Sequence, residues 1–250
     1  MKSSATNLSG YFLIFLMLLS FSGIAQQSKK ILVFSKTSGF HHESIVEGNA
    51  ALQQMGRENN FGVDTTTNAS DFTKEKLSQY AAVVFLNTTG DVLNPAQEQA
   101  FEQYIKSGHG FVGIHAASDT EFDWTWYGNL VGAYFVSHPK QQVATLNIVN
   151  RKTIATRHLP QEWKLKEEWY NFNWMTKEKL NVLITIDEKS YDPGANKMGD
   201  YHPIAWYHDF DGGRSFYTEL GHTKEAYADP LFLKHVLGGI QYAMGLKKMD

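Results

Sequence analysis

Short apolar runs alternate with helix-like segments along the first half of the chain, and this alternation restricts the fold more than any other feature. Residues 30–35, 81–86 and 110–114 are continuous apolar runs of strand length, and residues 61–67 form a further strand candidate. Between the strand candidates, residues 43–59 repeat apolar side chains at helical spacing. Strands and helices in this order form right-handed βαβ units, so we expect an α/β fold with a doubly wound parallel sheet.

The remaining elements are more mixed. Asn94 and Pro95 are typical of a helix start, and Gly108 of its end. The later strand candidates are residues 143–149, 181–186, 203–207 and 214–219. A turn at residues 209–213 predicts a hairpin, and Asp229-Pro230 opens a final helix. Because no linker, repeat or low-complexity segment interrupts residues 26–250, we expect one elaborated domain there.

The first 25 residues have the features of a secretory signal. Lys2 supplies a positive charge, residues 11–19 form a nine-residue apolar run, and Gly23 and Ala25 are small residues of the kind a signal peptidase reads. The run is shorter than the roughly 20 residues that a bilayer span needs. We therefore expect residues 1–25 to be a signal peptide, the mature protein to be exported to the periplasm or secreted, and no membrane span to remain. An uncleaved anchor is the alternative.

Cysteine and charge exclude several classes of function. The 250 residues include no cysteine, which excludes disulfides, iron–sulfur clusters, cysteine-bound zinc and a cysteine nucleophile. The ten histidines are then the main soft ligands and neutral-pH bases of the chain. Lys plus Arg number 23 against 26 Asp plus Glu, without a basic stripe, so we expect no nucleic-acid partner.

The turn at residues 113–118 is the most informative segment. A predicted strand ends in His115, and small residues follow, which is the pattern of a nucleophile elbow over the edge of an α/β sheet. Ligands of such sheets bind at the carboxyl ends of the strands, where this turn would lie. Because imidazole replaces serine or cysteine, we expect proton transfer or metal ligation rather than an acyl-enzyme. The alternative is a histidine that only hydrogen-bonds nearby backbone.

Other polar and aromatic residues fall near the same edge. His41 and His42 follow the first strand, and adjacent side chains point in different directions, so we expect at most one of them to face a site. Pro139 restrains the chain after His138, and Gly221 allows a tight turn that exposes His222. Carboxylates next to aromatic residues at positions 167–172 are typical of carbohydrate binding, although a partly buried strand edge has the same composition.

Together these motifs resemble the ThuA-like (trehalose-utilisation) family, part of the class I glutamine amidotransferase-like superfamily. The resemblance covers residues 31–245. It rests on segments 39–42, 110–119, 134–139, 168–170, 203–206 and 213–222. The family often has Gly-His-Pro where this chain has Ser137-His138-Pro139, a departure that leaves the imidazole in place.

The resemblance implies a flavodoxin-like fold of the amidotransferase type, in which His115 replaces the elbow cysteine and glutaminase activity is absent. It also implies functional roles for His42, His138, Tyr170 and His222, which match recurrent polar positions of the family, and for Glu168, the acidic residue before its aromatic pair. The candidate catalytic residues are His42, His115, His138 and His222, and the candidate substrate-binding residues are Asp119, Glu168, Trp169, Tyr170, His202 and Arg214.

Three functions fit this sequence. The first is an exported carbohydrate-processing enzyme that acts on glycosides or 3-keto-glycosides by histidine acid/base chemistry, with His115 as base or acid. The second is a metal-dependent hydrolase, with zinc or a related ion bound among the four candidate catalytic histidines; no His-Glu-x-x-His helix requires it. The third is a non-catalytic carbohydrate-binding domain. We expect a small sugar or glycoside as the partner. Both a monomer and a homo-oligomer are compatible with the sequence.

Overall fold

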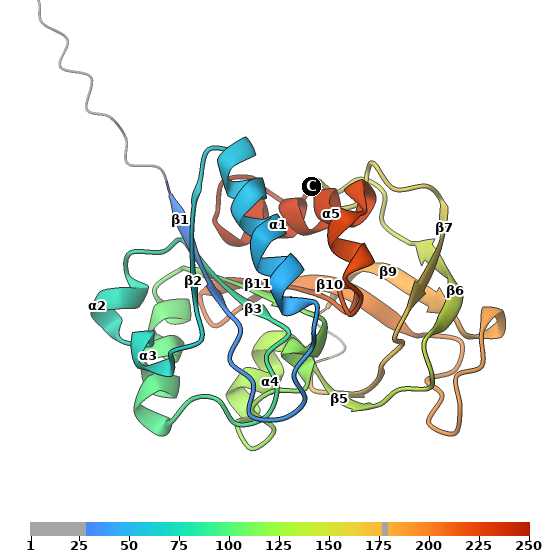
Figure 1. Cartoon of the computed structure of the whole chain (residues 1–250), viewed down its shortest axis with the longest axis horizontal. Helices are drawn as coiled ribbons and strands as arrows, with labels where there is room; N and C mark the ends of the chain where they lie inside the picture. Colours follow the sequence, from blue (N-terminus) through green and yellow to red (C-terminus); the bar gives the residue numbers. More distant parts are fainter. Residues whose placement is uncertain (1–28, 177–179) are drawn as a thin grey trace, which may run out of the picture.

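A nine-stranded mixed sheet with helices on both faces forms the centre of the protein (Figure 1). The computed structural model describes residues 29–176 and 180–250. The strand order is β2-β1-β3-β4-β11-β10-β9-β6-β7, and β5 and β8 pair separately. The strands are β1 Lys30–Phe34, β2 Gly62–Thr66, β3 Ala82–Leu86, β4 Gly110–Ile114, β5 Ala133–Ser137, β6 Gln142–Ile148, β7 Glu162–Glu167, β8 Asn171–Trp174, β9 Asn181–Asp187, β10 Pro203–Phe210 and β11 Gly213–Thr218.

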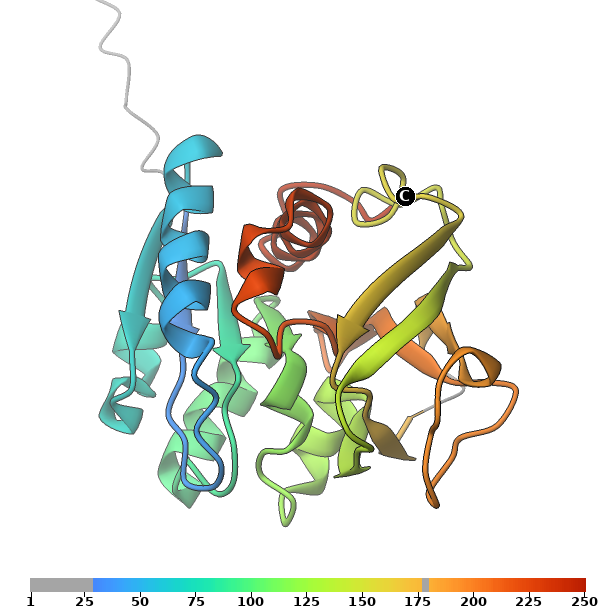
Figure 2. The same cartoon turned by 45° about the vertical axis from the view of Figure 1, so that its right-hand side comes forward.

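The pairing of the strands changes from parallel to antiparallel at β11. Strands β1 to β4 and β11 pair in parallel, whereas β10, β9, β6 and β7 extend the sheet by antiparallel pairing. Figure 2 shows this antiparallel extension on the side of the molecule away from α1 (Ile45–Glu58). The predicted α/β fold is therefore confirmed, with the parallel half as expected and the mixed second half forming the extension.

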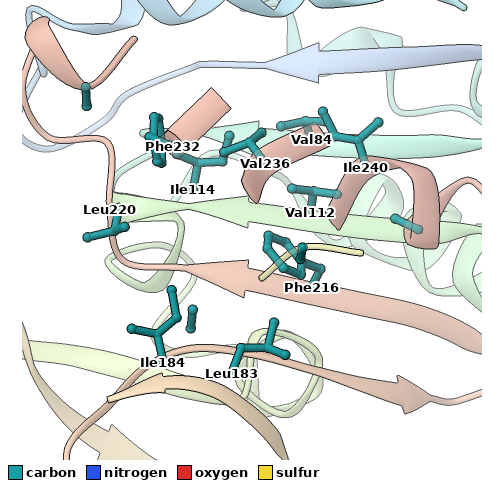
Figure 3. Packing of buried hydrophobic residues seen from close by; sticks show 14 of the residues in the cluster. Val84, Val112, Ile114, Leu183, Ile184, Phe216, Leu220, Phe232, Val236 and Ile240 are labelled. Atoms are coloured by element: carbon teal, nitrogen blue, oxygen red, sulfur yellow. The ribbon is translucent and has the colours of Figure 1, made fainter. Parts of the chain in front are cut away.

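Helices cover both faces of the sheet because its central strands are apolar on both sides. On one face, α5 (Pro230–Ala243) packs over a core that includes Val112, Ile114 and Phe216 (Figure 3). Helix α1 packs beside β2 and β3 and adds Leu52 and Met55 to this core. On the other face, α3 (Pro95–Lys106) and α4 (Thr125–Val131) pack over an aromatic core. The remaining helical segments are α2 Lys74–Leu77 and the 3₁₀ turns η1 Ala69–Asp71, η2 His115–Ser118, η4 Glu188–Ser190 and η5 Glu225–Ala228.

Helix boundaries agree with the sequence signals. Asn94 caps α3 by accepting from the backbone of Ala96 and Gln97, with Pro95 in the first turn. Asp229 accepts from Leu231 at the start of α5. Strands β5, β7 and β8 and helix α4 were not expected from the sequence. Strand β7 carries alternating charged residues at the edge of the sheet, a pattern without the apolar run that marks the central strands.

The predicted signal peptide, residues 1–25, lies outside the described residues. Within residues 29–176 and 180–250, no helix has the length and apolarity needed to cross a membrane.

Candidate functional site

His115 lies at the sharp turn that leaves β4, as the elbow pattern predicts. Its backbone adopts φ of +49°, in the left-handed region that a non-glycine residue rarely occupies, and it is the first residue of η2. The side chain is fully buried. Its Nδ1 lies 2.7 Å from the carbonyl oxygen of Glu219, which can only accept. The proton is therefore on Nδ1, and Nε2 presents its lone pair when the ring is neutral.

His222 faces His115 from the loop that follows β11. Gly221 has φ of +113°, which turns the chain at this point. His222 Nδ1 lies 3.1 Å from His115 Nε2, and its Nε2 lies 2.6 Å from the side-chain amide of Gln141. Burial lowers the pKa of His222, but the hydrogen bond and charge of Glu168 outweigh burial and raise that pKa above its ordinary value.

His42 completes the group of rings from the loop before α1. It is 3% exposed, and its ring centre lies 4.9 Å from that of His115 and 5.2 Å from that of His222. Burial, followed by the neighbouring imidazoles, lowers its pKa from 6.5 to about 3, so the ring is neutral at physiological pH. His41 is exposed and hydrogen-bonds Thr37, so only the second of the adjacent histidines enters the group.

Glu168 supplies the negative charge between these rings. It follows β7, and its Oε2 lies 3.5 Å from His115 Nε2 and 3.2 Å from His222 Nδ1. Burial raises the pKa of Glu168, but the neighbouring imidazoles of His115 and His222 overcome burial and hold that pKa far below its usual range. The carboxylate is thus ionised whenever the protein is folded near neutral pH.

His42, His115, Glu168 and His222, hereafter the four-residue cluster, have the donor set and spacing of a divalent-metal site. Each offers one ligand atom, and these four atoms lie within 4.8 Å of one another. Zinc bonds of about 2.0–2.1 Å in a tetrahedral site place neighbouring ligand atoms about 3.3–3.4 Å apart. The separations of 3.1, 3.2 and 3.5 Å among His115, Glu168 and His222 fit that spacing. The partner on the outward nitrogen of His115 also fits, because metal-binding histidines commonly donate that N–H to a carbonyl or carboxylate oxygen.

Two further buried carboxylates, Glu167 and Glu219, hold the backbone of the segments that carry the cluster residues. Glu167 accepts hydrogen bonds from the backbone nitrogens of Gly221 (3.1 Å) and Glu168 (3.2 Å), so it fixes both loops that carry ligands. Glu219 accepts from the backbone nitrogen of Tyr170 at 2.7 Å. Burial raises the pKa of both Glu167 and Glu219 above the ordinary value. These residues position the cluster rather than line a pocket.

His138 and Asp119 flank the cluster on a more accessible side. His138 Nδ1 lies 3.2 Å from Glu168 Oε1 and 2.9 Å from the carbonyl oxygen of Pro139, and its side chain is 40% exposed. Because Nδ1 donates, Nε2 is the nitrogen available for proton transfer. Burial raises the pKa of Asp119 to about 6, although the nearby His138 opposes the rise. Tyr170 packs on His115 with ring centres 4.4 Å apart.

A pocket of about 370 Å³ opens on the other side of the cluster. His42 and His222 form its inner wall, and Gln141, Lys224 and the exposed ring of Phe40 also line it. This volume is at the lower end of the range for small-molecule sites, about 300–1,000 Å³. The pocket therefore gives a small ligand direct access to two cluster residues.

Three predicted site residues lie away from the cluster. Trp169 is buried in the core and donates to the carbonyl oxygen of Gln142. His202 is buried between Glu188 and the backbone of Tyr170. Arg214 pairs with Gly110 at the amino end of β4. It therefore lies at the end of the strands opposite to His115, where it donates to backbone carbonyls.

Four residues that the structure places here had no expected site role from the sequence: Phe40, Gln141, Glu167 and Glu219. Glu167 stood inside the predicted carboxylate–aromatic segment, and Glu219 preceded the Gly221-His222 turn, so position alone could have indicated them. Gln141 has no such signal, because only the folding of β6 beside the His222 loop brings it close.

Comparisons with known proteins identify the family of this chain. The family model ThuA, described as trehalose utilisation, matches residues 30–243. The chain belongs to the ThuA family. No curated protein sequence matches it.

Solved structures of other ThuA-like proteins share the fold. A ThuA-like protein from Bacteroides uniformis is 23% identical, with a TM-score of 0.74 over 96% of this chain and 97% of the other. One from Parabacteroides merdae is 21% identical, with a TM-score of 0.73 over 88% and 91%. A β-galactosidase from Bacillus circulans has a TM-score of 0.57 at 13% identity, over 88% of this chain and 31% of its own. At these identities the likeness concerns the fold.

Proposed function

We propose that this ThuA-family protein is a metal-dependent carbohydrate-processing enzyme whose divalent cation, zinc or a related ion, binds to the four-residue cluster. The convergence of four ligand atoms within 4.8 Å carries the proposal. His115 cannot release its Nδ1 proton without losing the Glu219 hydrogen bond, and its buried Nε2 faces other cluster residues. Ligation therefore suits His115 better than the acid/base role expected from the sequence.

The acid/base roles fall to His138 and Asp119, which are more accessible. A pKa of about 6 lets Asp119 exchange a proton near neutral pH, and His138 is half-exposed beside it. A cation bound in the cluster would supply Lewis-acid polarisation of a substrate oxygen if that oxygen joined the protein ligands around it. The family description of trehalose utilisation supports a glycoside or 3-keto-glycoside as substrate.

A 3-keto-glycoside fits proton transfer by these two residues. The C3 carbonyl acidifies the C2–H bond, so one residue accepts that proton as the C1–C2 double bond forms. The C1–O bond breaks in the same elimination, and the leaving oxygen takes a proton from the second residue. The sequence of residues 1–25 supports an exported location for this chemistry.

Metal analysis of protein purified without chelator tests the proposal directly. We expect about one zinc or similar ion per chain, loss of that ion in His222→Ala, and retention in His41→Ala, the matched variant of an exposed histidine outside the cluster. Turnover is then screened with glycosides and their 3-keto derivatives. A metal content near zero together with full turnover in chelator would refute the metal-dependent function.

A further inference from the structure

Phe40 is the least expected residue beside the cluster, because a large aromatic ring is left in solvent. Its side chain is 67% exposed, and its ring meets that of His42 edge to face with centres 4.9 Å apart. Covering such a ring releases water from apolar surface, so the position favours a ligand with an apolar face.

The loop that carries Phe40 is fixed in place. The Thr89 hydroxyl donates to the Phe40 carbonyl at 2.8 Å, and the Gly39 nitrogen contacts the same hydroxyl at 3.2 Å. The Ser38 nitrogen donates to the Thr89 carbonyl at 2.7 Å, and the Ser38 hydroxyl to the Asp91 carbonyl at 2.6 Å. The backbone that presents the ring is therefore held before a ligand arrives, so binding loses little backbone conformational entropy there.

The rest of the pocket lining is polar. Besides Phe40, its described lining consists of His42, Glu43, Ser44, Gln141, His222, Thr223, Lys224 and Glu225. Lys224 Nζ lies 3.0 Å from Glu43 Oε2, so its charge is already balanced. One apolar plane facing amide, hydroxyl and carboxylate groups matches a pyranose ring, which has an apolar C–H face and hydroxyls around its edge. The lining carboxylates of Glu43 and Glu225 outnumber the single ammonium of Lys224, and this net negative charge disfavours a phosphorylated sugar.

We propose that Phe40 and this pocket form a subsite that stacks one uncharged pyranose ring next to the four-residue cluster. The inference rests on the proposed function in taking a sugar as the substrate, and it adds the position, ring form and charge of the bound unit. Phe40 is a binding residue in this scheme, and His42 connects it to the cluster through their ring contact.

Binding of trehalose tests the subsite without requiring turnover. Saturation-transfer NMR and calorimetry are performed with the full chain and with Phe40→Ala, Phe40→Trp and Leu246→Ala. Leu246 is the control because it is an exposed apolar residue after α5 that lines a different pocket. We expect transfer to ring C–H protons, an affinity loss of about tenfold in Phe40→Ala, and near wild-type binding in the other two variants. Trehalose 6-phosphate and the acyclic polyol sorbitol should bind more weakly.

Each result separates this inference from the proposed function. Trehalose binding that is unchanged in Phe40→Ala, equal binding of sorbitol, or no binding of trehalose by the wild type would overturn the subsite. Zinc content is measured on the same samples and should be unchanged in Phe40→Ala. If zinc is absent but Phe40-dependent trehalose binding persists, the metal centre is refuted and the subsite is supported.

Discussion

Acid should destabilise this protein through His42. The pKa of His42 is about 3 in the folded protein, against 6.5 for an unperturbed histidine. Between pH 3 and pH 6.5, His42 is therefore protonated in the unfolded chain and neutral in the folded protein. The contribution of His42 to stability is therefore complete above pH 6.5 and is lost as the pH falls toward 3. From pH 7 to pH 4.5 the lost free energy of unfolding is about 2.5 kcal/mol.

The assay is urea unfolding followed by tryptophan fluorescence, at several pH values and in chelator so that bound metal does not contribute. His42→Gln removes the titrating group, so its free energy of unfolding should fall about 2.5 kcal/mol less than that of the wild type between pH 7 and pH 4.5. His41→Gln is the matched control, because His41 is exposed, and it should follow the wild type. Parallel pH profiles for His42→Gln and the wild type would refute the reasoning.

Three further changes test the cluster and its surroundings. Glu168→Gln should weaken zinc binding about 100–1,000-fold, since four ligands contribute about 10–16 kcal/mol together; competition with a coloured chelator measures this. Glu167→Gln leaves one of two backbone donors without its acceptor, so chemical denaturation should show a loss of about 1–3 kcal/mol. If Asp119 is the base, activity should rise through pH 6 in the wild type, and Asp119→Asn should abolish this limb of the pH–rate profile.

Much of the fold could be predicted because its determinants are local. The apolar runs of β1, β3 and β4 and the caps of α3 and α5 lie within short segments. The edge strand β7 could not be predicted in this way, since its charged residues face solvent and only pairing with β6 defines it.

The site was predictable in its position but not in its chemistry. His115 was placed by the turn after its strand, yet the nitrogen it presents depends on the carbonyl of Glu219, 104 residues away. Arg214 shows the opposite limit. The sequence around Arg214 does not reveal that β11 runs parallel to β4. This pairing puts Arg214 at the amino ends of the strands, whereas His115 lies at their carboxyl ends.

The four cluster residues come from segments that are distant in sequence: the loops before α1, after β7 and after β11, and the turn after β4. A cation held by all of them would join four distant segments of the folded protein, and because it binds the folded chain and not the unfolded one, its binding free energy would add to stability. This chain has no cysteine with which to form a disulfide. Metal occupancy would then act as a removable cross-link between the two halves of the domain, so that loading with the ion and resistance to unfolding rise together.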